Sequence, residues 1–145
     1  MGNSTQRRWD LDSTLEDSLL KRAWEAQKHA YAPYSNFKVG AALLTKNGKI
    51  YTGSNVENAS YGLTICAERV ALFKAVSEGE REFKAIAIVT SSKDPIPPCG
   101  ACRQVLAEFS KDLLIVSQSI DKKKKRWFLN ELLPESFEFK GPGGS

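Results

Sequence analysis

Side chains that can share one metal ion lie in two short segments of the sequence. Cys66 stands in TICAERVALF with Glu68 two residues after it, and Cys99 and Cys102 form a Cys-x-x-Cys pair in PCGACRQVL. Thiolates are soft ligands, and in this number they select zinc among the divalent ions common in proteins. The chain has no fourth cysteine. Three thiolates leave one tetrahedral position open, which is typical of a catalytic zinc rather than a structural one.

A carboxylate beside such a site can move protons. Zinc in an open site brings the pKa of a bound water near ~7, and Glu68 is the candidate for the proton shuttle. The alternative is a solvated acid in the first turn of a helix, where acidic residues are favoured. Arg69 and Gln104 are candidates for donors to the sulfurs, because three thiolates around Zn²⁺ leave excess negative charge. A surface salt bridge is the other interpretation of Arg69, and we expect an ordinary structural role for the single histidine, His29.

Both cysteine segments are predicted to open helices. A helix N-terminus carries partial positive charge and therefore favours the thiolate that a metal requires. Two helix starts that face one point would bring the three sulfurs together. The first of these helices follows Thr64 and ends at Gly79, and the second begins in CGACRQVLAEFS.

The remaining pattern predicts a mixed α/β sheet covered on both faces. An amphipathic helix over 13–31, with Ser13 as its N-cap, precedes Pro33, and Asn47-Gly48 between two apolar runs predicts a hairpin. FKAIAIVT and LLIVSQ have the composition of interior strands, WFL predicts a late strand and ELLPESF a short helix. With 145 residues, 41% of them hydrophobic, we expect one domain over 13–139 between a flexible segment 1–12 and a flexible tail 140–145.

The positive charge is concentrated in one run, Lys122 to Arg126. This run holds five of the 21 Lys and Arg residues, so the other 16 face 17 acidic residues and the body is close to neutral. We interpret KKKKR as a solvated turn, with a polyanion-binding patch as the alternative. No run approaches the ~18 apolar residues of a membrane span, and the N-terminus lacks the apolar core of a signal peptide. We therefore expect a soluble cytoplasmic protein without nucleic-acid or membrane partners.

The motifs together resemble those of a known family. Cys-x-Glu followed by Pro-Cys-x-x-Cys is the signature of zinc deaminases, in the form with three cysteines. From Leu15 to Phe139 the chain resembles the small homotetrameric cytidine deaminases, through YAPYSNFKVGAAL, GSNVENASYG, CAERVALFKAVSEG, PPCGACRQVL and ELLPESF. The resemblance implies a three-layer α/β/α sandwich with a five-stranded mixed sheet. It also implies zinc-dependent deamination of cytidine and deoxycytidine to uridine and deoxyuridine, in pyrimidine salvage.

The resemblance also implies roles for individual residues. Glu68 becomes the general acid and base, and Cys66, Cys99 and Cys102 become the zinc ligands. The implied substrate-binding residues are Phe37, Asn55, Glu57, Tyr61, Ala67 and Phe137. Asn55 and Glu57 bind the ribose, and strand alternation places both on one face while Val56 turns into the core. Phe37 packs on the pyrimidine, the Ala67 N–H meets the base, and Phe137 comes from a neighbouring subunit.

Three alternatives remain for the function. One is a deaminase of another pyrimidine-like nucleoside such as blasticidin S, although the FKVGAAL and NVEN segments favour a ribonucleoside. Another is a nucleic-acid-editing deaminase, to which KKKKR points; such enzymes typically have His in the first ligand position and a broad basic groove. The last is a structural zinc or binding module.

Overall fold

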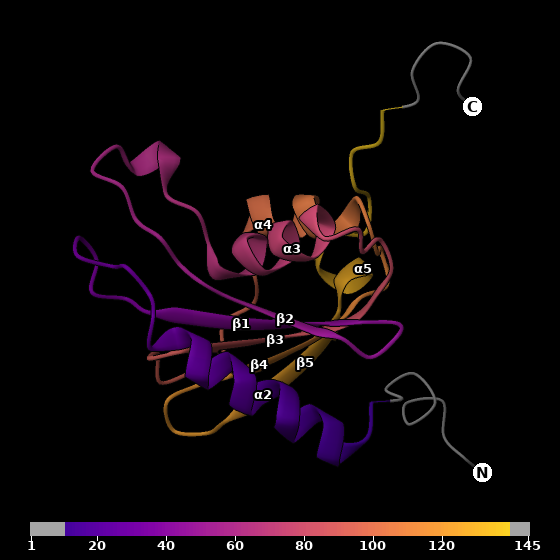
Figure 1. Ribbon diagram of the computed structural model, residues 1–145, viewed down its shortest axis with the longest axis horizontal. Helices are drawn as coiled ribbons and strands as arrows, with labels where there is room; N and C mark the ends of the chain where they lie inside the picture. The colour runs from indigo at the N-terminus through magenta and orange to yellow at the C-terminus, as the bar shows by residue number, and fades with distance from the viewer. Residues whose placement is uncertain (1–10, 140–145) are drawn as a thin grey trace.

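Figure 1 shows the order of helices and strands in a computed structural model of the protein, which describes residues 11–139. The elements are α2 (Ser13–Gln27), β1 (Val39–Thr45), β2 (Ile50–Ser54), the 3₁₀ helix η1 (Tyr61–Leu63), α3 (Ala67–Ser77), β3 (Phe83–Thr90), α4 (Gly100–Ala107), β4 (Leu114–Gln118), β5 (Lys124–Phe128) and α5 (Leu129–Leu132). Of the predicted flexible ends, residues 1–10 and 140–145 lie outside the described residues. Within residues 11–139, no helix combines the length and the hydropathy that crossing a membrane requires.

The five strands form one mixed sheet in the order β2-β1-β3-β4-β5. β1 pairs antiparallel with both β2 and β3, β3 pairs parallel with β4, and β4 pairs antiparallel with β5. The predicted hairpin joins β1 and β2, where Gly48 adopts φ +92°, a conformation that side chains disfavour. α4 lies in the crossover between the two parallel strands, as such a connection requires.

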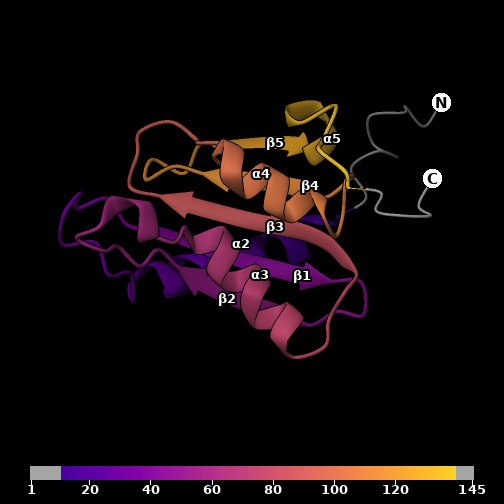
Figure 2. The same ribbon diagram turned by 90° about the horizontal axis from the view of Figure 1, so that it is seen from above.

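Helices cover both faces of the sheet, which confirms the three-layer prediction. α2 lies on one face and α3 and α4 on the other (Figures 1 and 2). On the α2 side, Leu19, Leu20 and Ala23 are buried against the sheet. On the other side, Leu72 of α3 and Leu106 of α4 are buried in a second core cluster. The sheet therefore holds the starts of α3 and α4 on one common face.

Two glycines allow the helices to approach the sheet closely. A Cβ on Gly40 would lie 2.1 Å from the Ala23 carbonyl oxygen of α2. A Cβ on Gly53 would lie 2.6 Å from the Ala67 carbonyl oxygen and 2.6 Å from the Ala71 nitrogen of α3. Because real Cβ atoms do not come this close to backbone atoms, α3 can pack this closely on β2 only if residue 53 is glycine.

The ends of α2 differ from the sequence prediction. Asp12, not Ser13, is the N-cap, and its Oδ1 accepts a hydrogen bond from the Leu15 N–H at 2.8 Å. Leu11 is 5% exposed and packs in the core, although the prediction assigned it to a flexible segment. The helix ends at Gln27, several residues before Pro33. Capping by an aspartate one residue earlier satisfies the same orphan N–H groups that Ser13 was expected to satisfy.

The interpretation of KKKKR as a turn is wrong for most of the run. Lys124 to Arg126 belong to β5, the edge strand that pairs with β4. Two guanidinium nitrogens of Arg126, Nε and Nη2, donate hydrogen bonds to the carboxylate of Glu16 on α2, at 2.8 and 2.7 Å. Lys124 lies 3.3 Å from Asp17 on the same helix. Lysines along an edge strand also discourage pairing with another chain, which is a common use of this residue.

Candidate active site

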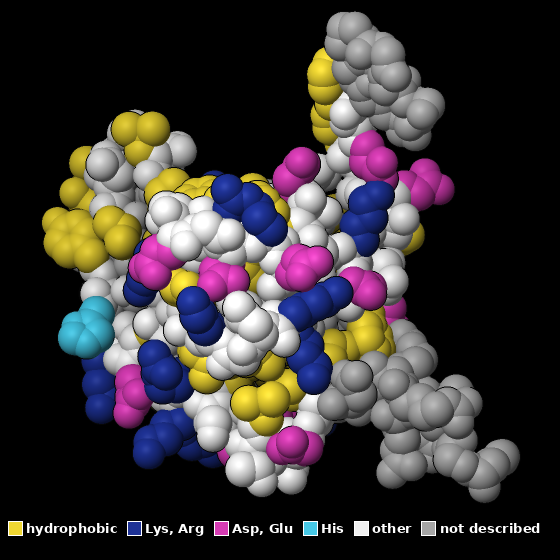
Figure 3. Space-filling model, turned by 45° about the vertical axis from the view of Figure 1, so that its right-hand side comes forward, with side chains coloured by type: hydrophobic (Ala, Val, Ile, Leu, Met, Phe, Trp, Pro, Cys, Tyr) yellow, Lys and Arg dark blue, Asp and Glu magenta, His cyan; other side chains and the backbone are white. Residues whose placement is uncertain are grey.

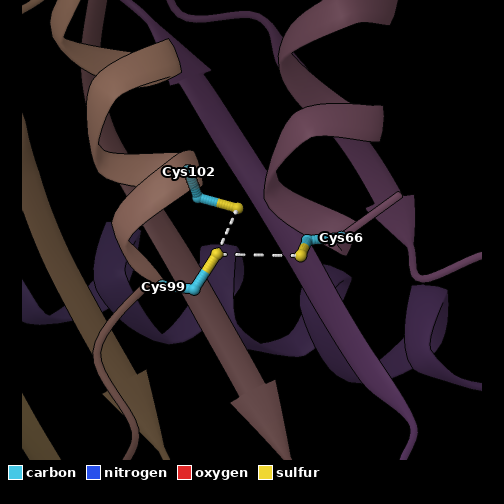
Figure 4. A group of neighbouring side chains, drawn as sticks. All are labelled: Cys66, Cys99 and Cys102. Atoms are coloured by element: carbon cyan, nitrogen blue, oxygen red, sulfur yellow. Dashed lines mark hydrogen bonds between the residues drawn. The ribbon is translucent and has the colours of Figure 1, made fainter. Parts of the chain in front are cut away.

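The three cysteines gather where α3 and α4 begin. Cys66 is the N-cap of α3, Cys99 is the N-cap of α4, and Cys102 lies in the first turn of α4. Figure 4 shows their sulfur atoms turned toward one another. The Sγ atoms of Cys66 and Cys99 are 3.9 Å apart and those of Cys99 and Cys102 are 3.4 Å apart. The sequence predicted this meeting of two helix starts.

This geometry fits a zinc ion. All three sulfurs lie within 4.8 Å of one another. Thiolates placed 2.3 Å from a tetrahedral zinc are about 3.8 Å apart, close to the observed separations. Cys102 is fully buried and Cys99 is exposed, so the cluster has one protected side and one open side. The donor set and its spacing therefore suit a zinc ion with a fourth position open to a ligand.

Hydrogen bonds within the cluster already favour a thiolate. The Cys102 thiol is the largest cause of the low pKa of Cys66, about 5, and Arg69 and Cys99 lower it further against the opposing effect of burial. Arg69 Nη2 donates to the Cys66 sulfur at 3.5 Å. The pKa of Cys102 is raised, first by its hydrogen bond to Cys66 and then by burial. Cys66 therefore loses its proton before Cys102, and Arg69 is the cation that offsets the charge.

Glu68 lies in the first turn of α3 and is 5% exposed, so it is not a solvated acid. Burial raises the pKa of its carboxyl to about 7, with the negative charge of Cys66 as a further cause and Arg69 opposing it. A carboxyl with this pKa can both hold and release a proton near neutral pH. Its side chain lines the same cavity as Cys66 and Cys99.

That cavity has a volume of about 280 Å³, near the lower end for small-molecule sites. The predicted site residues that line it are Phe37, Asn55, Glu57, Cys66, Ala67, Glu68 and Cys99. Asn55 and Glu57 follow the end of β2 and do face one space, but Val56 between them is 47% exposed rather than in the core. Sequence reasoning missed further lining residues: Ser35, Val39, Thr64, Ile88, Thr90, Ile96 and Pro97. Of these, Ile96 and Pro97 directly precede the Pro-Cys-x-x-Cys motif, and Ser35 lies in the quoted segment YAPYSNF.

An outer cavity of about 360 Å³ adjoins the first and shares Ser35, Glu57 and Thr64 with it. Tyr61 lines this outer space, with its ring in edge contact with Tyr34 at a centroid distance of 6.2 Å. Tyr61 is 75% exposed and does not line the inner cavity.

Phe137, which was predicted to act from a neighbouring subunit, and Gln104 line neither cavity of their own chain. Among the described residues, the lining of neither cavity includes Phe137, whose side chain is 72% exposed. The C-terminal segment lies at the opposite end of the molecule from the loops before β1 and after β2 (Figures 1 and 2). The Gln104 carboxamide bonds the backbone of Phe137, a contact different from the predicted donation to sulfur.

Comparison with known proteins agrees with this site. Residues 13–118 match the family model described as the cytidine and deoxycytidylate deaminase zinc-binding region. A cytidine deaminase of Halalkalibacterium halodurans is 53% identical over 120 residues, which cover 82% of this chain and 91% of that protein. One of Mycobacterium tuberculosis is 42% identical over 119 residues, covering 82% of this chain and 86% of that protein. The crystal structure of cytidine deaminase from Burkholderia pseudomallei superposes with a TM-score of 0.81 at 52% identity, over 83% of this chain and 98% of that one.

Proposed function

The chain belongs to the cytidine and deoxycytidylate deaminase family, and from that membership we propose that it hydrolyses cytidine and deoxycytidine to uridine and deoxyuridine with release of ammonia. One observation carries the proposal: the buried carboxyl of Glu68 lines the same small cavity as Cys66 and Cys99, two members of the three-sulfur cluster. Asn55 and Glu57 line this cavity as well. A cavity of this size suits a free nucleoside better than a nucleic-acid strand.

Cys66, Cys99 and Cys102 would hold the zinc ion. When bound, zinc supplies a Lewis acid that brings the pKa of a coordinated water near ~7. Arg69, which donates to the Cys66 sulfur at 3.5 Å, offsets the negative charge of the thiolates. Burial of Cys102 and the fold of α4 keep the cluster fixed, because both helix starts rest on the same sheet.

Glu68 carries the protons. In the proposed reaction its carboxylate takes a proton from the attacking water and delivers it to N3 of the pyrimidine. It then takes the second proton of that water from the new 4-hydroxyl group and passes it to the 4-amino group. As the C4–N4 bond breaks, ammonia leaves and the oxygen from water becomes the 4-carbonyl oxygen of the product. The raised pKa of Glu68, about 7, suits both directions of transfer at neutral pH.

The sugar and the base are recognised by the other lining residues. Asn55 and Glu57 provide polar groups for the ribose, Phe37 an aromatic face for the pyrimidine, and Ala67 a backbone N–H at the start of α3. Tyr61 would contribute at the mouth of the cavity, in the outer space that it lines. The residues that line the two cavities include the carboxylates of Glu57 and Glu68 and no Lys, Arg or His. Because negative groups repel a phosphate, this lining favours a nucleoside over a 5′-phosphorylated substrate.

We also propose that the protein is a homotetramer with shared sites, in which Phe137 completes the cavity of a neighbouring subunit. Exposed hydrophobic side chains support this assembly: Tyr34, Tyr61 and Leu63 on the projecting loops, Phe73 on α3, and Phe137 and Phe139 near the C-terminus. Figure 3 shows such side chains gathered on the projecting part of the molecule. Three free cysteines suit the reducing cytoplasm, where we place the protein in pyrimidine salvage.

The experiment is a spectroscopic assay of the purified zinc-loaded protein with cytidine, deoxycytidine, cytosine, blasticidin S and a cytosine-containing DNA strand. Loss of the cytidine absorbance with release of one ammonia per turnover is the expected result. Glu68→Gln should keep its zinc and lose at least ~10²-fold in kcat, the scale of acid–base catalysis. Turnover of only blasticidin S or only DNA would replace the nucleoside proposal, and near-normal turnover in Glu68→Gln would refute the proton pathway.

A further inference from the structure

Ser35 lies between the two residues that the proposed function assigns to the sugar and the base. It stands in the loop between α2 and β1 and lines both cavities. Its hydroxyl donates a hydrogen bond to Oε2 of Glu57 and accepts one from the Phe37 N–H at 3.0 Å. One exposed side chain thus joins a carboxylate from the β2 side of the cavity to an aromatic residue from the β1 side.

The carboxylate of Glu57 is held by the same loop at its other oxygen. Oε1 accepts hydrogen bonds from the backbone N–H groups of Tyr34 and Ser35, at 3.0 and 3.1 Å. A carboxylate offers about four lone-pair sites, so these three donors leave about one, on Oε2, for a ligand. The hydrogen bond from Ser35 is also the largest cause of the lowered pKa of Glu57, which keeps the group ionised.

Phe37 is held from both sides of its backbone. Its N–H bonds the Ser35 hydroxyl, and its carbonyl oxygen accepts a hydrogen bond from Nδ2 of Asn55 at 2.8 Å. Oδ1 of Asn55 accepts from the Val39 N–H at 2.9 Å. Ser35 and Asn55 therefore fix the point where the loop enters β1, and with it the ring of Phe37.

We propose that Ser35 is a positioning residue for nucleoside recognition, which directs the free acceptor of Glu57 toward one sugar hydroxyl and sets the place of Phe37 beside the base. The inference rests on the proposed function, because it assumes that the cavity binds a nucleoside. Without the hydroxyl, Oε2 loses its only donor from the loop among the described residues, and the carboxylate can rotate away from the ligand. The Phe37 N–H then loses its acceptor as well.

The test compares zinc-loaded wild type with Ser35→Ala, Ser35→Thr and a control, Ser77→Ala. Ser77 is an exposed serine at the end of α3 whose hydroxyl bonds the Lys74 carbonyl oxygen. Ser35→Ala should lower kcat/KM for cytidine by tenfold or more, mostly through KM, because a hydrogen bond to a charged group is lost. Zinc content and melting temperature should stay unchanged, since the side chain is exposed. Ser35→Thr, which keeps the hydroxyl, should retain most of the activity.

A double variant separates positioning from a general structural effect. In the Glu57→Ala background, Ser35→Ala should cost at most about threefold more, because only the link to Phe37 remains to be lost. A repeated loss of tenfold or more would overturn the proposal, as would a Ser35→Ala enzyme within twofold of wild type. If wild type itself does not deaminate a nucleoside, the proposed function fails, and the role of Ser35 fails with it.

Discussion

The Gln104 side chain and the Phe137 backbone form a closed pair of hydrogen bonds. Nε2 of Gln104 donates to the Phe137 carbonyl oxygen at 3.0 Å, and the Phe137 N–H donates to Oε1 at 3.2 Å. An ion pair between Lys111 and Glu138 adds a second attachment beside it. The segment that carries Phe137 is therefore fastened to α4, the helix that also carries Cys102, while its ring remains 72% exposed. A ring held rigidly and outward is preorganised to contact another chain.

Gln104→Ala is therefore expected to weaken both assembly and substrate binding. Loss of two hydrogen bonds frees the segment, so the Phe137 ring must be ordered again when subunits meet, at a cost of about 1–3 kcal/mol. Light scattering at decreasing protein concentration should show earlier dissociation, and KM for cytidine should rise together with it. Phe137→Ala should have the same two effects, and Glu108→Ala, an exposed change near the end of the same helix, should have neither. A fully assembled Phe137→Ala protein with normal KM would contradict the shared cavity.

The zinc content of cysteine variants tests the ligand set. Metal analysis of the wild type should return about one zinc per chain, because the three sulfurs are spaced for one ion. Cys99→Ser should lose most of it, since a neutral hydroxyl is a poor substitute for a thiolate. Ala101→Ser, an exposed change in the same turn, is the matched control and should keep its metal. Full occupancy in Cys99→Ser would show that another group is the ligand.

Glu68 should make the metal-free protein less stable as the pH rises. Its folded pKa of about 7 lies above the ordinary 4.5, so between these values the folded state keeps a proton that the unfolded state has lost. The stabilisation is complete below pH 4.5 and disappears toward pH 7, a change of about 3 kcal/mol in the free energy of unfolding. Glu68→Gln cannot titrate and should lack this slope. Urea denaturation of metal-free wild type and metal-free Glu68→Gln at pH 4.5 and pH 7 measures this difference in slope, because the thiols are present in both proteins. Parallel pH profiles of the two proteins would contradict the buried carboxyl.

The sequence predicted the meeting of the three cysteines at two helix starts, because the signals for these helix starts are local. Cys66 and Cys99 stand at positions where prolines, glycines and apolar runs mark the start of a helix, and both are N-caps in the structure. Gly48 and Gly79 mark a hairpin and a helix end through their positive φ angles. Each of these predictions needs only a few neighbouring residues.

The missed features depend on contacts between distant segments. The predicted late strand WFL includes only the last two residues of β5, Trp127 and Phe128. The first three residues of β5 are exposed and charged, so only the pairing with β4 reveals where the strand begins. Val56 was expected in the core by strand alternation, but β2 ends at Ser54 and Val56 forms only isolated bridges with Tyr31 and Ile65. Ser35 contacts Glu57 across 22 residues, a separation at which no sequence period gives a signal.

Gly53→Ala should disturb the metal site by displacing α3, the helix that Cys66 caps. The new Cβ would lie 2.6 Å from two backbone atoms of α3, which must move away from the sheet together with Cys66 at its N-terminus. We expect a loss of about 1–3 kcal/mol in the free energy of unfolding from this overpacking, and a weaker affinity for zinc in competition with a chelator. Gly62→Ala, with no atom within 4 Å of its Cβ, is the control and should change neither quantity. Unchanged stability in Gly53→Ala would mean that α3 is not in close contact with β2.

Within the KKKKR run, Arg126 is a structural cation, whereas Lys123 is solvated. Glu16 is 3% exposed, and Arg126 meets both of its carboxylate oxygens, so Arg126→Ala leaves a buried carboxylate without its bidentate partner. Because the arginine itself is partly exposed, we expect a loss of about 1–3 kcal/mol in urea denaturation rather than the larger values of fully buried pairs. Lys123→Ser removes only a contact of 3.6 Å between two exposed side chains and should change stability by less than ~0.5 kcal/mol. Turnover of cytidine should stay within about twofold of wild type in both variants, because α2 lies on the face of the sheet opposite to α3 and α4, the helices whose starts carry the cysteines. A larger fall in kcat for Lys123→Ser than for Arg126→Ala would instead connect the lysines to the reaction.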